Sequence, residues 1–252
     1  MASSPDPQYF DSFDGTRLAW REIGEGRPVV LLHGFISDAI TNWIRYGHAE
    51  AVAANGFRVI MPDLRGHGSG ARPHDAASYP LDALADDGFA LISHLGLTDY
   101  DLGGYSLGAR TTARMLVRGA NPRRVVFSGM GLDGLTKADR RAGHFRNILT
   151  NLGSFKQGSP EWLAEAFLKT SGGDPQALLG VIDTFVGSTE AQIAAITQPA
   201  AVVCGAEDQD NGIAADLAAL LPHGKYIEVP GGHMSSVTKP ELGRAIANFL
   251  AA

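Results

Sequence analysis

The stretch 100–110, Tyr-Asp-Leu-Gly-Gly-Tyr-Ser-Leu-Gly-Ala-Arg, decides the fold of this chain. An apolar run leads into Gly104-Tyr-Ser-Leu-Gly108, and an alanine- and arginine-rich stretch that is typical of a helix follows. A serine between these glycines predicts a sharp strand-to-helix turn with a strained serine, Ser106. Gly104 and Gly108 are needed because a Cβ at either position would clash as strand and helix close together. The turn exposes the hydroxyl of Ser106 and directs a helix N-terminus at it, which suits a developing negative charge.

Strands and helices alternate on both sides of this turn. Asp14-Gly15 predicts a tight hairpin between the first two extended runs. Near-continuous apolar runs predict strands that are buried on both faces of a sheet. The expected strands are 9–13, 16–23, 28–33, 57–61, 100–105, 124–127, 200–204 and 225–229, with helices near 81–95, 109–118, 213–221 and 240–250. This alternation predicts an α/β fold with a mostly parallel sheet flanked by helices.

The segment from 132 to 198 differs from the rest of the chain. It has no convincing strand, and its spacing predicts helices at 140–152, 160–170, 175–185 and 190–196. An all-helical insertion after the sixth strand predicts a cap over the C-terminal edge of the sheet, where open α/β sheets bind ligands. We therefore expect a core of residues 1–131 and 199–252, with a helical cap, or lid, at 132–198.

A serine hydroxyl needs a base, and the base needs an orienting acid. His233 follows the last expected strand, behind Gly231-Gly232, and is the expected base. Asp208 follows the strand before it and is the expected acid. The order Ser, Asp, His is the one expected for such a turn in an α/β sheet. Other carboxylates could also serve as the acid, and they are Glu207, Asp210 and Asp133.

Two backbone donors should stabilise the negative oxygen that forms when a serine attacks a carbonyl. The N–H of Leu107, directly after the serine, is the first expected donor. The second is the N–H of Phe35, because Gly34 lets the chain bend toward Ser106 after the strand 28–33. We expect the neighbouring His33 to brace this loop rather than act as a second base.

Taken together, these motifs resemble the α/β-hydrolase superfamily in its serine-nucleophile, esterase- and lactonase-like branch. The matching stretches fall in the family's order over nearly the whole chain and are His33-Gly-Phe35, Pro62-Asp-Leu-Arg-Gly-His-Gly68, Gly104 to Gly108, Gly205-x-x-Asp208 and Gly232-His233. The resemblance implies Ser106 as nucleophile, His233 as base and Asp208 as its partner. It also implies Phe35 and Leu107 as oxyanion donors, and the 63–68 run as a supporting loop.

The expected function is that of a cofactor-free serine hydrolase, with no metal, that cleaves a small carboxylic ester or lactone through an acyl-serine. Cleavage of a carbon–carbon bond in a dioxo acid and perhydrolysis are alternatives on the same triad. An acidic substrate would require cationic side chains, for which Arg140, Arg141 and Arg146 are candidates. A low-turnover ligand receptor is a further alternative. Trp43 and Trp162 could line the pocket or serve packing.

The composition excludes several classes of partner. The net charge of −6 over 252 residues, without a basic face, argues against nucleic acid and anionic membranes. Cys204 is the one cysteine and is expected to be a small buried side chain, so no internal disulfide can form. The N-terminus lacks the pattern of a signal peptide and no run is long enough to span a membrane, so we expect a cytoplasmic protein. The oligomeric state carries no expectation.

Overall fold

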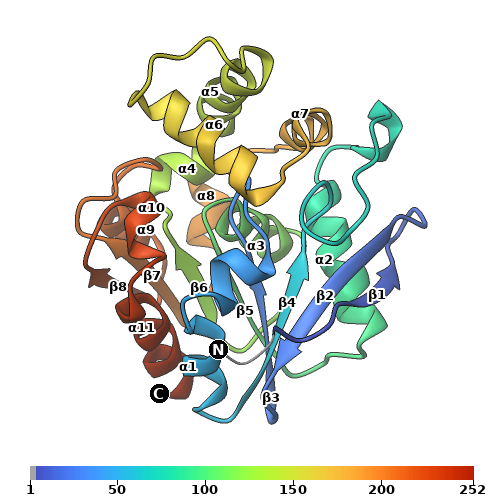
Figure 1. Ribbon diagram of the computed structural model, residues 1–252. Coiled ribbons are helices and arrows are strands. Elements are labelled where there is room, and N and C mark those ends of the chain that lie inside the picture. Colours follow the sequence, from blue (N-terminus) through green and yellow to red (C-terminus); the bar gives the residue numbers. More distant parts are fainter. Residues whose placement is uncertain (1–3) are drawn as a thin grey trace.

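An eight-stranded sheet forms the centre of the molecule, with the strand order β1-β2-β4-β3-β5-β6-β7-β8 (Figure 1). The computed structural model describes residues 4–252. The strands are β1 (Gln8–Asp11), β2 (Arg17–Ile23), β3 (Arg27–Leu32), β4 (Phe57–Asp63), β5 (Asp101–Tyr105), β6 (Val125–Ser128), β7 (Ala200–Gly205) and β8 (Gly224–Val229). Strands β3 to β8 run parallel, and β2 is antiparallel to both β1 and β4. The predicted α/β class and mostly parallel sheet are therefore confirmed.

Both faces of the sheet are covered, which explains the near-continuous apolar runs of its inner strands. In β3, Val29 and Leu31 pack toward one face, and Val30 and Leu32 pack toward the other. The first face carries α1 (His48–Ala53) and α11 (Pro240–Ala251), which contact each other. The opposite face carries α2 (Ala83–His94), α3 (Leu107–Val117) and α9 (Ala214–Leu220). Shorter segments are the π-helix η1 (Ile40–Ile44), the 3-10 helix η2 (Ala76–Ser78) and α10 (His233–Ser236).

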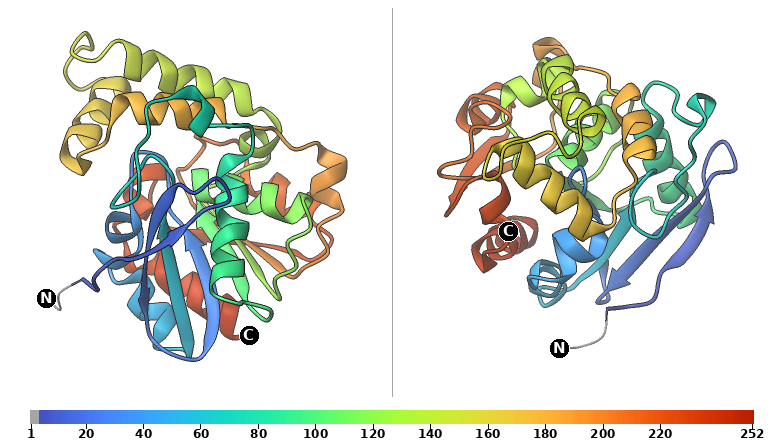
Figure 2. Two further views of the ribbon diagram at one scale, coloured as in Figure 1. Left: turned by 90° about the vertical axis from the view of Figure 1, so that its right-hand side faces the viewer. Right: turned by 45° about the horizontal axis from the view of Figure 1, so that its top comes forward.

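Five helices stand between β6 and β7. They are α4 (Leu132–Thr136), α5 (Ala138–Thr150), α6 (Pro160–Ser171), α7 (Pro175–Asp183) and α8 (Glu190–Ala194). Helices α5, α6 and α7, which we call the cap helices, lie together beyond one end of the sheet (Figures 1 and 2). Helix α8 instead packs against α3 and α9, beside the sheet. The division of the chain into a core and a cap at 131/132 and 198/199 stays a prediction.

Local sequence sets the starts of the last two cap helices. Ser159 accepts a hydrogen bond from the N–H of Trp162, and Asp174 accepts hydrogen bonds from two N–H groups in the first turn of α7. A proline follows each of these residues, at a position where its missing N–H costs nothing. These caps turn a glycine-rich insertion into separate short helices. No helix within residues 4–252 has the length and hydropathy that crossing a membrane requires.

Candidate active site

Ser106 occupies a strained turn between β5 and α3. Its φ of 52° and ψ of −106° lie outside the regions that residues other than glycine normally adopt. A Cβ on Gly104 would lie 2.3 Å from the carbonyl carbon of Gly108, and a Cβ on Gly108 would lie 2.1 Å from the carbonyl oxygen of Leu32. Both distances are far below van der Waals contact, so the strand and helix can approach this closely only with glycine at the two positions.

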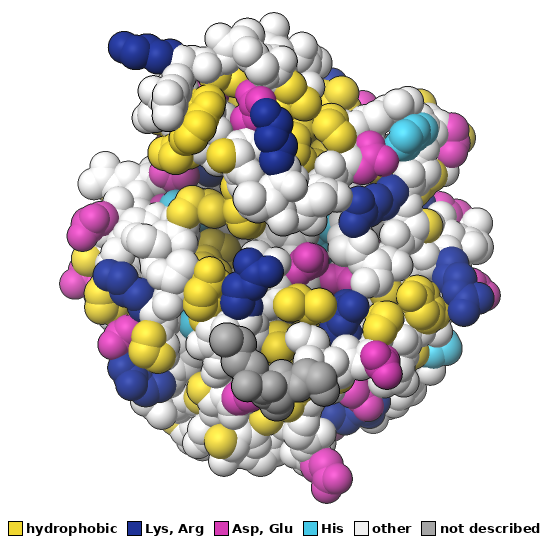
Figure 3. Space-filling model, viewed as in Figure 1, with side chains coloured by type: hydrophobic (Ala, Val, Ile, Leu, Met, Phe, Trp, Pro, Cys, Tyr) yellow, Lys and Arg dark blue, Asp and Glu magenta, His cyan; other side chains and the backbone are white. Residues whose placement is uncertain are grey.

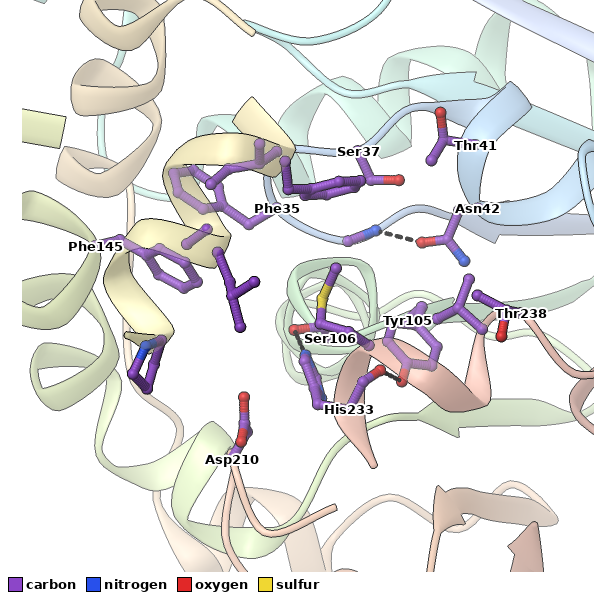
Figure 4. A pocket seen from close by; sticks show the side chains of 18 of the residues that line it. Phe35, Ser37, Thr41, Asn42, Tyr105, Ser106, Phe145, Asp210, His233 and Thr238 are labelled. Atoms are coloured by element: carbon purple, nitrogen blue, oxygen red, sulfur yellow. Dashed lines mark hydrogen bonds between the residues drawn. The ribbon is translucent and has the colours of Figure 1, made fainter. Parts of the chain in front are cut away.

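The structure brings three predicted side chains into one hydrogen-bonded chain, and Figure 4 shows the link between Ser106 and His233. His233 Nε2 lies 3.0 Å from Ser106 Oγ, and His233 Nδ1 lies 2.8 Å from Asp208 Oδ2. Each residue follows the C-terminal end of a parallel strand: Ser106 follows β5, Asp208 follows β7 and His233 follows β8. The side chain of Asp208 is only 1% exposed and that of His233 9%. This is the arrangement in which a histidine can take a proton from a serine while a carboxylate holds the ring.

Asp208 is kept as a charged acceptor. Burial raises its pKa, but the hydrogen bond and the charge of His233 outweigh that effect and hold the pKa of this carboxyl below its usual value. Asp208 Oδ1 accepts a further hydrogen bond from the N–H of Asp210, and the thiol of Cys204 lies 3.5 Å from Oδ2. Burial, with the adjacent carboxylate, raises the pKa of the Cys204 thiol, so its S–H stays a donor. A charged Asp208 requires the proton on His233 Nδ1, which leaves Nε2 free to accept from Ser106.

The other candidate carboxylates are not hydrogen-bonded to His233. Asp133 of α4 forms an ion pair with Lys137, directly after that helix, at 2.9 Å. Asp210 pairs with Arg141 of α5 at 3.0 Å, and Glu207 is exposed. Among residues 4–252, Asp208 is the carboxylate that is hydrogen-bonded to His233.

The two predicted oxyanion donors lie beside Ser106. Phe35, Ser106 and Leu107 line one small cavity of about 10 Å³. Leu107 is the first residue of α3, so its N–H needs no partner within the helix. The N–H of Gly34 donates to Asn42 Oδ1 at 2.9 Å, which fixes the start of the Phe35 loop (Figure 4). The role of these N–H groups as oxyanion donors stays a prediction.

Two buried histidines frame that loop. The N–H of Leu64 donates to His33 Nε2 at 2.9 Å, so the ring proton is on Nδ1, which donates to the Gly34 carbonyl at 2.8 Å. In the same way His67 Nε2 accepts from the N–H of Ile36 at 3.3 Å, while Nδ1 lies 3.0 Å from the Arg65 carbonyl. Each ring therefore has to be neutral with the proton on Nδ1. His33 is placed to brace the loop, and it does not contact Ser106.

Burial sets the charge state of both rings. It lowers the pKa of His33, and burial, together with the neighbouring His33, lowers the pKa of His67 to about 3. An unfolded histidine titrates near pH 6.5. Between about pH 6.5 and pH 3, His67 is therefore protonated in the unfolded chain and neutral in the folded chain. Stability supplied by neutral His67 is thus complete above pH 6.5 and declines as the pH falls toward 3.

We expect the substitution His67→Asn to reduce the loss of stability between pH 7 and pH 5. The proton linkage of His67 alone predicts that the wild type loses about 2 kcal/mol of unfolding free energy over this interval, and the variant lacks this contribution. Urea unfolding of both proteins at the two pH values measures the difference. Equal pH dependence in the two proteins would contradict a neutral, buried His67.

A large cavity opens above Ser106, beneath the cap helices. It has a volume of about 540 Å³, within the usual range for sites that bind small molecules. Ser106 and His233 lie on its floor, and Phe145, Leu163 and Phe167 of α5 and α6 supply apolar walls. Figure 3 shows hydrophobic side chains gathered in the hollow between the cap helices and the rest of the molecule. The rings of Phe35 and Phe145 both line this cavity and contact each other, with centroids 4.7 Å apart (Figure 4).

Some residues of the site were not identified from sequence. The hydroxyl of Tyr105 donates to the carbonyl of His233 and lies 3.0 Å from Ser236 Oγ, which ties α10 to the end of β5. The position of Tyr105 directly before the serine could have indicated from the sequence that it belongs to the site.

Neither Trp43 nor Trp162 lines the cavity, and Trp43 is buried in the core. Across the described chain, 4–252, no cluster of three or more His, Cys, Asp or Glu side chains is placed to hold a metal ion.

Sequence comparisons place this architecture among known proteins. Residues 27–130 match the family model described as alpha/beta hydrolase fold. The AB hydrolase superfamily protein YisY of Bacillus subtilis strain 168 is 30% identical over 131 residues, which are 51% of this chain and 47% of YisY. A non-heme haloperoxidase of Rhodococcus erythropolis is 34% identical over 107 residues, which are 42% of this chain and 36% of that protein. The matched stretches thus span less than half the length of these relatives.

Solved structures agree with the chain over nearly its whole length. An esterase from Exiguobacterium antarcticum, EaEST, has a TM-score of 0.78 and 20% identity, with 98% of this chain and 100% of the esterase covered. The enol-lactonase from Burkholderia xenovorans LB400 has a TM-score of 0.75 and 20% identity, with 97% and 100% covered. At these identities the likeness establishes the fold, and the predicted α/β-hydrolase fold is confirmed.

Proposed function

Because this chain is an α/β-hydrolase-fold protein, we propose that it is a serine hydrolase that cleaves a small carboxylic ester or lactone through an acyl-serine intermediate. One observation carries the proposal: an unbroken hydrogen-bonded chain runs from Asp208 through His233 to Ser106, on the floor of a cavity of about 540 Å³. Esterases and an enol-lactonase among proteins of similar fold support this reaction class.

The proposed reaction has two stages. Ser106 Oγ attacks the substrate carbonyl while His233 Nε2 takes the hydroxyl proton, and Asp208 stabilises the imidazolium that results. The carbonyl oxygen becomes an oxyanion, which the N–H groups of Phe35 and Leu107 stabilise. When the tetrahedral intermediate collapses, His233 returns the proton to the leaving alcohol. A water then gives a proton to His233 and attacks the acyl-serine, and His233 returns this proton to Ser106 Oγ as the acid is released.

The shape of the cavity supports a small substrate. The cap helices supply apolar walls to it, so an acyl chain would lie against Phe145 and Phe167 while its carbonyl faces Ser106. The loop that carries Phe35 is held by Asn42, His33 and His67. A loop held in this way supports a preorganised oxyanion site, which provides much of the rate enhancement in acyl transfer.

A fluorophosphonate probe tests the nucleophile directly. We expect one covalent adduct per chain, on the peptide that contains Ser106, because an activated serine attacks the phosphorus centre as it would a carbonyl. Peptide mass spectrometry identifies the site, and hydrolysis of p-nitrophenyl esters from acetate to octanoate measures acyl preference. Labelling at another residue, or no labelling alongside undiminished esterase activity, would contradict the proposal.

A further inference from the structure

Arg110 is a buried cation without a partner. It lies one turn after the nucleophile on α3, where its N–H donates to the carbonyl of Ser106 at 3.0 Å, and the residue is only 5% exposed. Its guanidinium makes no hydrogen bond or ion pair with any residue of 4–252, and the buried Nη1 has no acceptor. The ring of Phe185, with its centroid 5.0 Å from Cζ, is a neighbour of the guanidinium.

The other buried arginines of the described chain are paired. Arg21 binds Asp63 at 3.0 Å, and Arg65 binds both Asp14 and Asp87. A buried charge with no partner is strongly destabilising, so it is usually retained only for a function. Carboxylate partners account for the burial of Arg21 and Arg65, whereas the burial of Arg110 needs another explanation.

The charged neighbours of Arg110 include a second arginine, Arg141. Burial and then the charge of Arg141 lower its pKa to about 10, which still leaves the guanidinium protonated at neutral pH. Arg141 Nε is also buried without an acceptor, and its Nη2 is paired with Asp210. Asp139 is the carboxylate that favours the charged form of Arg110, but it forms no ion pair with it. The small cavity that Arg110 and Arg141 line has no carboxylate among its described lining residues.

Arg110 and the nucleophile share a small cavity, and Arg110 also lines a second small pocket beside Thr184 and Phe185. Arg110 lines the small cavity of about 10 Å³ that also touches Ser106 and Leu107. That cavity shares Phe35, Ser106, Arg141 and Phe145 with the large substrate cavity. Its volume corresponds to about one water-sized atom. One oxygen of an anion in the large cavity could therefore reach Arg110 while the rest of the anion remains beside Ser106.

We propose that Arg110, with Arg141 beside it, forms an anion subsite next to Ser106, and that the substrate carries a carboxylate close to the scissile carbonyl. This inference rests on the proposed serine hydrolase function and narrows its substrate class. A carboxylate would accept charge-assisted hydrogen bonds from the guanidinium groups of Arg110 and Arg141, which line the small cavity together. Substrate binding would then neutralise the buried cation.

Matched ester pairs test the subsite. Monomethyl succinate and methyl levulinate are nearly isosteric and differ by a carboxylate in place of a methyl ketone, and monomethyl malonate and methyl acetoacetate form a shorter pair. We expect the wild type to prefer the half-ester of at least one pair. Arg110→Gln should lower kcat/KM for that half-ester by about 10- to 100-fold, mainly through KM, and change the neutral ester by less than about threefold. Arg110→Lys should restore part of the preference.

Arg140→Gln is the matched control. It removes an arginine from the same region, but its side chain is 78% exposed and does not line the large cavity, so the half-ester preference should be unchanged. Equal losses for the charged and neutral esters in Arg110→Gln would overturn the subsite and assign Arg110 to the oxyanion or to structure. A wild type with no preference for either half-ester would also overturn it.

A binding measurement separates this inference from the proposed reaction. In the Ser106→Ala background, succinate or malonate should raise the thermal unfolding midpoint, and Arg110→Gln should abolish that rise. Without ligand, Arg110→Gln should unfold at a higher temperature than its parent because it removes an unpaired buried charge. Dicarboxylate binding that needs Arg110, without hydrolysis of any ester, would support the subsite and refute the hydrolase. Ester hydrolysis without dicarboxylate binding and without a preference for the half-esters would support the hydrolase and refute the subsite.

Discussion

Replacing Ser106 by alanine is expected to lower kcat for the best p-nitrophenyl ester by about 10⁴- to 10⁶-fold. The substitution removes the Oγ that lies 3.0 Å from His233 Nε2, so no acyl-serine can form. Residual turnover would come only from water that is oriented near His233 and from the oxyanion donors. Steady-state kinetics with purified protein measures the change, and the fluorophosphonate adduct should disappear in parallel.

The control for this prediction is Ser93→Ala. Ser93 is exposed on α2, away from the cavity, and its loss should leave kcat unchanged. The alanine that replaces Ser106 must also occupy the strained turn, so circular dichroism and the unfolding midpoint should confirm that the variant is folded. A folded Ser106→Ala variant with more than about a tenth of the wild-type kcat would refute the acyl-serine mechanism.

The substitution Asp208→Asn should lower kcat by about 10³- to 10⁴-fold while the fold is kept. The asparagine amide can donate to Nδ1 of His233, which places the ring proton on Nε2, where it can no longer accept from Ser106. The loss of the negative charge also removes the stabilisation of the imidazolium that forms during the reaction. Kinetics on the same ester measure the effect.

Asp133→Asn is the matched control because it makes the same change at the other candidate acid that follows a strand. Asp133 is paired with Lys137 on the surface, so kcat should stay within about threefold of the wild type. If Asp133→Asn lost activity and Asp208→Asn did not, the orienting acid would have been assigned to the wrong strand end.

The sheet was predictable because each strand carries its own signal. Buried runs such as 28–33 and 200–204 have the length and β-branched content of strands covered on both faces, and β3 and β7 lie where these runs predict them. The starts of helices were equally predictable where N-capping residues precede them, as at Ser159 and Asp174. The placement of α8 against α3 and α9 was not predictable, because the periodicity of a helix does not say which neighbour its apolar face will meet.

The three hydrogen-bonded residues of the site were predictable from the sequence for a similar reason. Ser106, Asp208 and His233 each follow a recognisable strand, and parallel strands deliver their C-terminal ends to one edge. Arg110 was not identified, because an arginine on an amphipathic helix normally reaches solvent, whereas α3 lies with the sheet on one side and α8 and the 185–188 segment nearby. Of the three cap arginines, only Arg141 lines the large cavity, and the spacing along a helix could not distinguish it from Arg140.

The cap helices occupy one uninterrupted stretch of chain, residues 138–183, while the three triad residues all lie outside it. Under the proposed function, the reacting residues therefore lie outside the stretch that supplies the apolar walls of Phe145, Leu163 and Phe167. Two crossovers that flank this stretch would exchange those walls and leave Ser106, Asp208 and His233 in place. Such chimeras would test whether the range of substrates changes with this stretch while the proposed reacting residues are kept.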